Sequence, residues 1–494
     1  MAQQKENIRI GLYSAGLKCY WGQFEGLRER LIGYGKFIEN KLADYGAVCN
    51  FGLVDDEFSG REAGEWFNSQ NVDILFCHSA TYFTSASVLP VHQICKAPVV
   101  ILNLQPAPEM NYLSTGTGEW LAHCVACPVP EICNAFNRAN IEYQVINGLL
   151  GLEETPDISV ADEVNYDRPE AVRAWDEIIG WVRAAQVKKT LMHSRFGFLG
   201  NNYSGMLDMY SDFTMLQAQT GIHIELLEMC DLDRNMQKVT DADVETKKRD
   251  IAEFFTISGD SPSDPIAKKP TEEQLDWSAR VAAAQSKLVE EYKLNSISYY
   301  YHGSDNYYEE LQGGFIVGHS LLTADHVPCA GEGDIKTALA MKICDILGKG
   351  GSFCEIVATD YNKGTIILGH DGPFHIDIAG EKPVLRGMGV YHGKRGSGVS
   401  VEAQVKEGKV TLLGITQTVE GKLRMIISVG EAVNYQTLMI GNTQTHVKFD
   451  TDPDSYMDKW FIQAPTHHLA MSVGDNKAVF EKVAKLMDIE YTII

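Results

Sequence analysis

The run IRIGLYS, residues 8–14, is followed by the helical pattern FEGLRERLIGYGKFIENKLADY, residues 24–45, and by a second apolar run, VCNFGLV, residues 48–54. The alternation continues with VDILFCH, residues 72–78. Continuous apolar strands separated by helices are typical of a parallel sheet that is covered on both faces. The pattern therefore predicts a doubly wound α/β domain, of the Rossmann or flavodoxin-like type, over residues 1–185.

A second α/β domain is expected over residues 186–350. KKTLMHSRFGFLG (188–200) and HIELLEM (223–229) contain short apolar runs, and SISYYYH (296–302) follows a long helix-rich stretch. Strand-like runs that alternate with helical segments again favour a parallel sheet. A chain of 494 residues is also too long for one core, because domains contain on the order of 150 residues.

From residue 351 onward the pattern changes to short strands joined by tight turns. KEGK (406–409) and VEGK (419–422) lie between segments that alternate or run apolar. Such turns indicate antiparallel pairing of the flanking strands. We expect a mostly antiparallel, β-barrel-like C-terminal domain over residues 351–494, with a helix near its end.

Composition and charge narrow the class of ligand. The net charge of −23 would repel nucleic acid and anionic membranes, so a neutral or cationic small molecule is the expected ligand. No window approaches the roughly 18 apolar residues of a membrane span, and no leader segment is recognised, which predicts a cytoplasmic protein. The nucleotide-binding patterns G-x-G-x-x-G after the first strand and G-x-x-x-x-G-K-[ST] are absent, so neither a dinucleotide nor a nucleoside triphosphate is expected.

The eleven cysteines are odd in number and scattered, and Cys77, Cys95 and Cys344 lie within apolar runs. Buried reduced thiols are therefore expected rather than a disulfide framework. Cys124 and Cys127 form a lone C-x-x-C without a second pair of ligands, so a zinc or redox role there is not favoured.

The stretch CAGEGDIKTAL, residues 329–339, holds Glu332 between two glycines and just before an apolar-periodic helix. Asp334 is expected to cap that helix, whose apolar face includes Ile335 and Leu339. Glu332 would then lie near the positive end of the helix. It is either a capping or solvated acid or a carboxylate placed for chemistry.

A second acid faces a histidine if YNKG (361–364) forms a hairpin loop. Counting outward from that loop places Glu355 opposite His370. A carboxylate and an imidazole among apolar residues form either a buried ion pair or half of a metal site. His467 and His468 form another pair in an apolar setting, APTHHLAM, residues 464–471.

These segments resemble the motifs of the L-arabinose isomerase family. AGEGDIKTAL, SFCEI, ILGH and THHLAM are similar to the family motifs in order and spacing, and the first match is highly specific. The resemblance implies two α/β domains followed by a β-rich domain. It also implies a divalent metal bound by Glu332, Glu355, His370 and His468, with Glu332 and Glu355 as catalytic acid and base.

The family resemblance also implies Mn2+, or another divalent cation such as Co2+ or Mg2+, and no organic cofactor. A hard octahedral ion accepts carboxylate and imidazole ligands and leaves two positions for the sugar oxygens. The expected reaction is aldose–ketose isomerisation of a free sugar, in which a chelated cis-enediol-type intermediate carries the proton between neighbouring carbons. A homo-oligomer, trimer or hexamer, is expected, with each active site completed by a neighbour's first domain.

Two segments depart from the family where it contacts the sugar. GLKCYWG (16–22) replaces Gln-His-Leu-Tyr-Gly, and MNYLSTGT (110–117) places Ser114 and Thr117 where the family has glutamine and histidine. L-arabinose is therefore expected to be a poor substrate. Tyr20 and Trp21, after the first strand, are candidate sugar contacts.

His375 and His467 are further candidate substrate-binding residues, and His375 is also a rival metal ligand because the family histidine follows Leu-Gly by one more residue. Two alternatives remain open. One is a metal-assisted epimerase or an isomerase of a deoxy or acid-substituted sugar. The other is a non-catalytic sugar-binding protein built on two α/β domains.

Overall fold

The structure is a computed structural model that describes residues 8–154, 156, 164–304, 306–388, 390–391, 394–395 and 397–494. It divides into two compact units, one within Lys5–Lys189 and the other covering Thr190–Ile494. Each unit is described by itself. None of the described helices is both long enough and apolar enough to cross a membrane.

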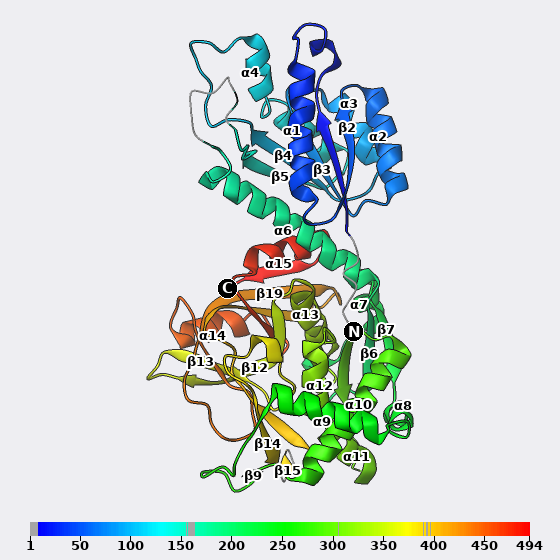
Figure 1. Cartoon of the computed structure of the whole chain (residues 1–494), viewed down its shortest axis with the longest axis vertical. Coiled ribbons are helices and arrows are strands. Elements are labelled where there is room, and N and C mark those ends of the chain that lie inside the picture. Colours follow the sequence, from blue (N-terminus) through cyan, green and yellow to red (C-terminus); the bar gives the residue numbers. More distant parts are fainter. Residues whose placement is uncertain are drawn as a thin grey trace. The chain divides into compact units, whose positions relative to one another are not determined.

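The first unit contains a parallel sheet of five strands in the order β2-β1-β3-β4-β5 (Figure 1). The strands are β1 (Arg9–Ala15), β2 (Ala47–Val54), β3 (Ile74–Ser79), β4 (Val99–Gln105) and β5 (Tyr143–Leu149). The helices are η1 (Lys18–Tyr20), α1 (Leu27–Leu42), α2 (Glu57–Gln70), α3 (Ser85–Ile94), α4 (Thr117–His123), α5 (Val129–Arg138) and α6 (Pro169–Met192). This strand order is the flavodoxin-like one.

Helices cover both faces of the first sheet, as the continuous apolar strands require. Phe67 from α2, Val91 from α3 and Phe136 from α5 pack in one core against Tyr13 and Leu75 of the sheet. On the other face α1 packs against β1 and β2. The predicted doubly wound α/β architecture is confirmed for this unit.

The second unit begins with a parallel sheet of four strands in the order β11-β10-β6-β7. The strands are β6 (Arg195–Gly200), β7 (His223–Leu227), β10 (Ser296–Tyr300) and β11 (Cys329–Ala330). The helical elements are η2 (Leu207–Met209), α7 (Phe213–Thr220), α8 (Met229–Met236), α9 (Asp241–Phe254), α10 (Glu272–Tyr292), α11 (Asn306–Gly313), α12 (Phe315–Ala324) and α13 (Ile335–Ile346). Numbered by chain order, these strands repeat the 2-1-3-4 arrangement of the first sheet.

That repeated order places a switch point between β6 and β10, where ligands of open α/β sheets bind beyond the carboxyl ends of the strands. β6 ends at Gly200, β10 at Tyr300 and β11 at Ala330. Because parallel strands end at the same edge, the loop that carries Glu332 leaves the sheet beside the loops that follow β6 and β10.

The C-terminal part of the second unit is a closed antiparallel barrel of six strands, in the order β18-β21-β12-β13-β20-β19 and back to β18. The strands are β12 (Gly350–Asp360), β13 (Thr365–Gly369), β18 (Gly408–Gln417), β19 (Leu423–Val433), β20 (Thr445–Lys448) and β21 (His468–Val473). The remaining elements are η3 (Ile376–Ile378), α14 (Pro453–Phe461), α15 (Lys477–Leu486) and β22 (Glu490–Ile493), which pairs with β19 in parallel. The β-barrel-like prediction is confirmed.

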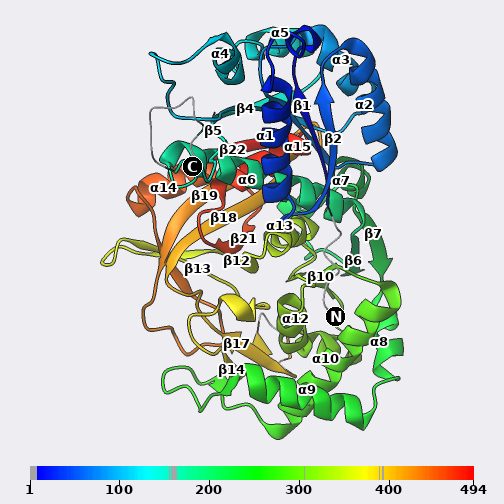
Figure 2. The ribbon, with the colours of Figure 1, turned by 45° about the horizontal axis from the view of Figure 1, so that its top comes forward.

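Helix α13 lies between the parallel sheet and the barrel (Figure 2), where it contacts β10, β12, β18 and β21. Every residue from Ile335 to Asp345 is buried. The helix is therefore enclosed on all sides, rather than packed along the single apolar face that the sequence indicates. Its first turn is held rigidly against both layers.

One predicted turn does not join paired strands. VEGK (419–422) closes the β18–β19 hairpin, where Thr418 N donates to Lys422 O over 2.8 Å. KEGK (406–409) instead lies between two different sheets, because β17 pairs with β14 while β18 enters the barrel. The small sheet contains β8 (Thr256–Ile257), β9 (Ala267–Lys268), β14 (Val384–Met388) and β17 (Val399–Glu402), and a separate pair is formed by β15 (Val390–Tyr391) and β16 (Lys394–Arg395).

The division of the chain after residues 185 and 350 remains a prediction. The second unit contains both the second parallel sheet and the barrel.

Candidate metal centre

Four predicted metal ligands meet in the second unit, although they come from four separate segments. Glu332 follows β11, Glu355 lies on β12, His370 follows β13 and His468 begins β21. Their donor atoms and those of His467 form two groups, and within each group all the atoms lie within 4.8 Å of one another. One group is Glu332 with His467 and His468, and the other is Glu355 with His370 and His468. His468 belongs to both groups and joins them into one cluster.

Glu332 is held by its backbone in the left-handed region, with φ of 57°, and Gly333 follows with φ of 77°. The carbonyl of Glu332 accepts from Tyr203 N over 2.9 Å, and Gly333 N donates to Tyr299 O over 3.0 Å. A Cβ at Gly333 would lie 2.4 Å from the carbonyl oxygen of Asn201. The loop is therefore clamped between β10 and the segment that follows β6, and it turns the Glu332 side chain, 17% exposed, toward the histidines.

The pairing of β12 with β13 differs from the prediction by one residue at Glu355. Asp360 pairs with Thr365 as expected, but a bulge between Ile356 and Ala358 shifts the ladder so that Glu355 faces Gly369 rather than His370. A bulge adds a residue to one strand only, and the turn residues carry no signal for it. Glu355 faces His468 across the other edge of its strand.

Phe353 lies two residues before Glu355 on the same strand face and supports both imidazoles. Its ring centroid lies 4.7 Å from that of His370 and 4.4 Å from that of His468. Residues i and i+2 of a strand project to the same face, which places the phenyl ring beside the carboxylate. The cluster therefore has an apolar wall on one side.

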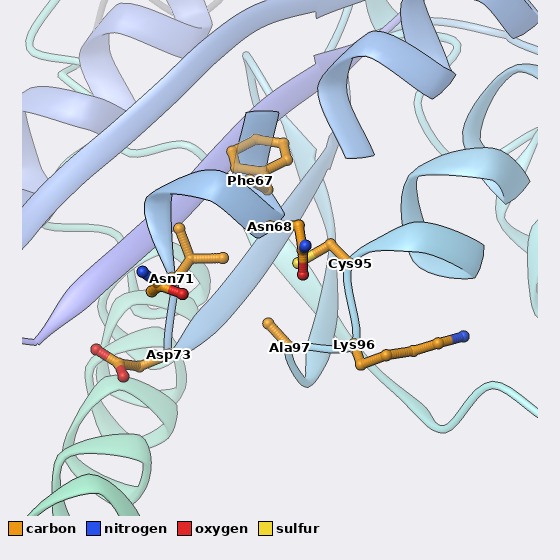
Figure 3. A pocket seen from close by; sticks show the side chains of 8 residues that line it. Phe67, Asn68, Asn71, Asp73, Cys95, Lys96 and Ala97 are labelled. Atoms are coloured by element: carbon orange, nitrogen blue, oxygen red, sulfur yellow. The ribbon is translucent and has the colours of Figure 1, made fainter. Parts of the chain in front are cut away.

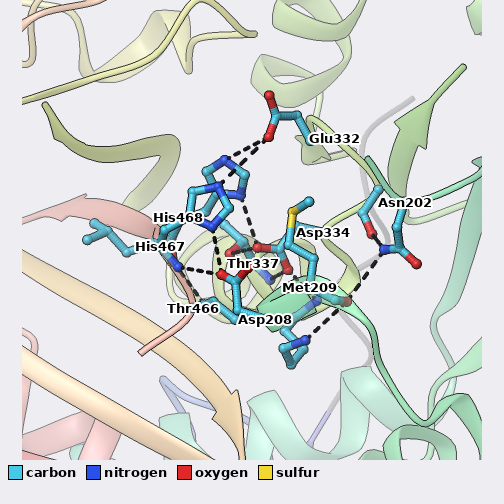
Figure 4. Close-up of polar contacts among 12 residues, drawn as sticks. Asn202, Asp208, Met209, Glu332, Asp334, Thr337, Thr466, His467 and His468 are labelled. Atoms are coloured by element: carbon cyan, nitrogen blue, oxygen red, sulfur yellow. Dashed lines mark hydrogen bonds and ion pairs between the residues drawn. The ribbon is translucent and has the colours of Figure 1, made fainter. Parts of the chain in front are cut away.

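His468 is fully buried and is oriented by Asp334, whose Oδ2 accepts from Nδ1 over 3.1 Å (Figure 4). Asp334 also caps α13, as predicted, by accepting from the backbone N–H groups of Lys336 and Thr337. Nε2 of His468 is thereby directed at Glu332 Oε2, 3.4 Å away. Neither of these two atoms has a hydrogen-bond partner within the described ranges.

Burial lowers the pKa of His468 below its ordinary value, although the hydrogen bond to Asp334 acts in the opposite direction. A neutral imidazole with a free Nε2 lone pair is the form that binds metal ions. Burial alone would raise the pKa of Glu332, but His467, His468 and His370 lower it, so its carboxylate is ionised.

His467 directly precedes β21 and is tied to Asp208 of η2 (Figure 4). Asp208 Oδ2 accepts from Nδ1 over 2.6 Å and from the backbone N–H over 2.9 Å. Nε2 then lies 3.9 Å from Glu332 Oε2. Burial opposes protonation, but Asp208 and Glu332 raise the pKa of His467 to about 10.

His370 pairs through Nδ1 with Asp371 Oδ1 at 2.9 Å and is nearly fully buried. Burial alone would lower its pKa, but Asp371, Glu332 and Glu355 raise it. Three carboxylates thus surround the imidazole of His370. Bound protons and a divalent cation would compete for this cluster, because metal ligands must be deprotonated.

The remaining predicted residues belong to neither group of donor atoms. His375 is buried, and its backbone N–H donates to Ser352 Oγ over 3.2 Å. Tyr20, Trp21, Ser114 and Thr117 belong to the first unit, at Lys5–Lys189. The Trp21 indole donates to Asp55 Oδ2 over 2.7 Å, and Ser114 and Thr117 are exposed. Their predicted contacts with substrate remain predictions.

Asp208 and Asp371 were missed by sequence reasoning. Asp371 directly follows His370, and adjacency to a candidate ligand is a signal that could have found it. Asp208 lies 259 residues before its partner His467, and nothing in its local sequence marks it.

The first unit contains a hollow of about 310 Å³ (Figure 3). Its lining consists of Phe67, Asn68, Asn71, Val72, Asp73, Cys95, Lys96 and Ala97. These residues precede β3 and β4, so the hollow lies at the amino ends of the strands, away from the edge where open α/β sheets bind ligands. Asp73 there already accepts from Lys189 Nζ and Arg9 N.

The donor set fits a divalent cation. Two carboxylates and the imidazole nitrogens supply the oxygen and nitrogen ligands that such ions accept. Glu332 Oε2 and His468 Nε2 are buried and have no hydrogen-bond partner among the described residues. Asp334 behind His468 supplies the outer carboxylate that commonly orients a ligating histidine.

Fold and site together define a class of protein: two flavodoxin-like parallel sheets, a closed six-stranded barrel and a carboxylate–histidine cluster between the second sheet and the barrel. Residues 381–494 match the family model of the L-fucose isomerase C-terminal domain. The chain is 23% identical to the L-arabinose isomerase of Escherichia coli (strain K12), over 65% of this chain and 64% of that protein. The L-arabinose isomerase of Shigella boydii serotype 18 is 21% identical over the same shares.

The chain therefore resembles the L-arabinose isomerases over 65% of its length and, over residues 381–494, the C-terminal domain of L-fucose isomerase. The chain spans just under two thirds of the length of the curated relatives it matches. Among solved structures, a GDSL-like lipase from Bacteroides thetaiotaomicron shares 10% identity at a TM-score of 0.18, covering 35% of this chain and 85% of that one.

Proposed function

We propose that the protein is a divalent-metal-dependent aldose–ketose isomerase that acts on a free sugar. The observation that carries the proposal is the meeting of Glu332, Glu355, His370 and His468, from four separate segments, in one cluster. The similarity to L-arabinose isomerases supports the reaction class. Mn2+ is the proposed ion, with Co2+ or Mg2+ as substitutes.

The ion would be held by Glu332, Glu355, His370 and His468. When bound, it would polarise the sugar carbonyl and acidify the neighbouring C–H. Interconversion of aldose and ketose moves one hydrogen between C1 and C2 and one proton between O1 and O2. One of the two glutamates takes the proton from carbon and returns it to the neighbouring carbon of a cis-enediol, and the other carries the hydroxyl proton.

The environment of each glutamate suits these roles. Neighbouring histidines, His467 above all, hold the pKa of Glu332 below its ordinary value, so its carboxylate is ionised and can accept a proton from carbon. Phe353 limits the access of water on one side of the cluster. His467 presents Nε2 toward Glu332 and can contact a sugar oxygen between them.

The proposal includes an altered sugar specificity, because the segments that hold Tyr20, Trp21, Ser114 and Thr117 depart from the arabinose isomerase pattern. The second candidate function, which rests on the same observation, is isomerisation or epimerisation of a deoxy or acid-substituted sugar. We also propose that the chain assembles as a homotrimer or a hexamer and that it acts in the cytoplasm. All eleven cysteines are free, which agrees with a reducing compartment.

The test is a substrate screen of the purified chain with Mn2+ across pentoses, hexoses, deoxy sugars and sugar acids, read as ketose or aldose formed. Conversion of at least one sugar, lost on removal of the ion, supports the proposal. Binding of a sugar without any conversion would favour a binding protein instead.

A further inference from the structure

The first turn of α13 connects to two histidines of the candidate site, His467 and His468. Asp334, at the helix start, holds His468 directly. Two residues on, Lys336 is 1% exposed, and its Nζ donates to Ser211 Oγ over 2.7 Å and to Met209 O over 3.3 Å. A buried ammonium group needs such acceptors, since an unpaired one would be costly to desolvate.

These contacts fix the short η2 segment, which carries Asp208. Met209 is fully buried, and its carbonyl also accepts from Asn202 Nδ2 over 3.4 Å. The same amide group donates to Gly333 O over 2.7 Å, so η2 and the Glu332 loop share a tether. Asp208 is thus a carboxylate about one-third exposed on a turn held by hydrogen bonds, rather than a mobile surface acid.

Asp208 holds His467 at two points, through the backbone N–H and through Nδ1. Two bonds to one carboxylate oxygen fix both the strand end and the rotation of the ring. Nε2 is left facing Glu332 Oε2 at 3.9 Å. That separation is too long for a direct hydrogen bond, yet an oxygen atom between the two groups could lie about 2.7–3.0 Å from each.

We propose that Asp208 is a positioning residue: anchored by Lys336 through η2, it fixes the imidazole of His467 so that Nε2 and Glu332 together grip one hydroxyl or carbonyl oxygen of the substrate. The proposal rests on the isomerase function proposed above. It makes the segment that begins at Glu332 responsible for one carboxylate of the site and for the orientation of His467 and His468. Asp208 itself does not touch the substrate.

The kinetic test compares Asp208→Asn, Asp208→Glu and a control, Asp212→Asn, on a sugar that the parent isomerises. Loss of an outer partner of this kind lowers activity by about 10- to 100-fold. We expect that loss in Asp208→Asn with unchanged Mn2+ affinity and thermal midpoint, and partial recovery in Asp208→Glu. Asp212 caps α7 four residues further on, and asparagine caps equally well, so Asp212→Asn should behave as the parent.

The anchor is tested with Lys336→Met, which replaces the ammonium group by an apolar side chain of similar shape. We expect the same loss as in Asp208→Asn, and a double variant no worse than either, because both act through His467. If Lys336→Met does not fold, Asp208→Asn still decides the proposal. Parental kinetics in Asp208→Asn, or an equal loss in Asp212→Asn, would overturn it.

A structural readout separates this inference from the proposed function. Crystal structures of the parent and Asp208→Asn should show His467 rotated away from Glu332 in the variant only. An unchanged ring would refute the positioning role even if activity fell. If the parent converts no sugar at all, the proposed function fails, and the ring orientation alone then decides whether Asp208 positions His467.

Discussion

Asp334 Oδ2 accepts from His468 Nδ1 over 3.1 Å, and both side chains are completely buried. The same carboxylate caps α13, so the helix that joins the parallel sheet to the barrel also fixes the tautomer of the central histidine. Burial opposes ionisation of Asp334, but His468 and Lys336 lower its pKa. One residue thereby couples helix formation to the presentation of Nε2 toward Glu332.

Asp334→Asn separates these two tasks. Asparagine caps a helix about as well as aspartate, so stability should change by less than about 1 kcal/mol. The neutral amide is a weaker acceptor for Nδ1–H, so Mn2+ affinity should fall about 10- to 100-fold. Titration calorimetry with Mn2+ and thermal melts measure the two effects, and Asp212→Asn serves as the N-cap control. Parental Mn2+ affinity would argue against an orienting role.

The local pattern around Glu332 predicted much of this site, because the cap, the two glycines and the following helix are encoded within a few residues. The parallel sheets were equally predictable from continuous apolar strands separated by helices. His468 could be proposed as a ligand from resemblance, but its contact with Asp334 depends on how β21 packs beside α13. That packing is tertiary and has no local signal.

The register of β12 shows a different limit. Counting outward from the hairpin gave the correct pair, Asp360 and Thr365, but the bulge near Val357 placed Glu355 opposite Gly369. On the other edge of β12 the partner of Glu355 is His468, from a segment more than a hundred residues later. Barrel closure, which depends on all six strands, decides that neighbour.

Metal removal should abolish activity. Glu332 Oε2 and His468 Nε2 have no hydrogen-bond partner among the described residues, and we expect one ion per chain to bind both atoms. We expect EDTA-treated protein to be inactive, to recover with Mn2+ more fully than with Zn2+, and to bind one ion per chain by elemental analysis. Zn2+ favours four-coordinate tetrahedral sites, which leaves fewer positions for two sugar oxygens. Full activity of protein shown to be metal-free would contradict the mechanism.

L-arabinose should be a poor substrate. Ser114 and Thr117 have shorter side chains than the glutamine and histidine of the resembling family segment, and Trp21 is already engaged with Asp55. A substrate that loses one hydrogen bond to a sugar hydroxyl has a much lower kcat/KM, because a buried polar group is left unpaired. We expect kcat/KM for L-arabinose to be below that for at least one other sugar. A kcat/KM for L-arabinose above that for every other sugar tested would show that these segments do not alter the sugar specificity.

Glu332→Gln and Glu355→Gln should each lower kcat by at least about 100-fold with the fold intact, because an amide neither takes up a proton nor binds a cation as a carboxylate does. The double variant should be little worse than either, since the two act as one unit. Steady-state isomerisation, metal content and thermal melts are measured together. Glu431→Gln, an exposed acid on β19, is the control. Near-parental turnover with bound metal in Glu332→Gln would return that residue to a capping role.

The backbone at Glu332 makes a last prediction, because φ of 57° is unfavourable for any residue with a Cβ. The left-handed conformation costs about 1–2 kcal/mol, and glycine avoids that cost while losing about 0.5–1 kcal/mol of unfolded-state entropy. Glu332→Gly should therefore be more stable than Glu332→Ala by up to about 1 kcal/mol, although both lack the carboxylate and should be inactive.

Lys293 provides the matched control, since it has φ of 53°, is exposed and ends α10 outside the site. The same preference for glycine over alanine is expected there, without loss of activity. Thermal melts of the four variants in EDTA give the comparison. An alanine variant as stable as the glycine variant at position 332 would mean that the loop relaxes and stores no strain. If the glycine variant is the more stable, the backbone of this turn disfavours Glu332, and the site retains the residue for its carboxylate. That pattern is expected where function opposes stability.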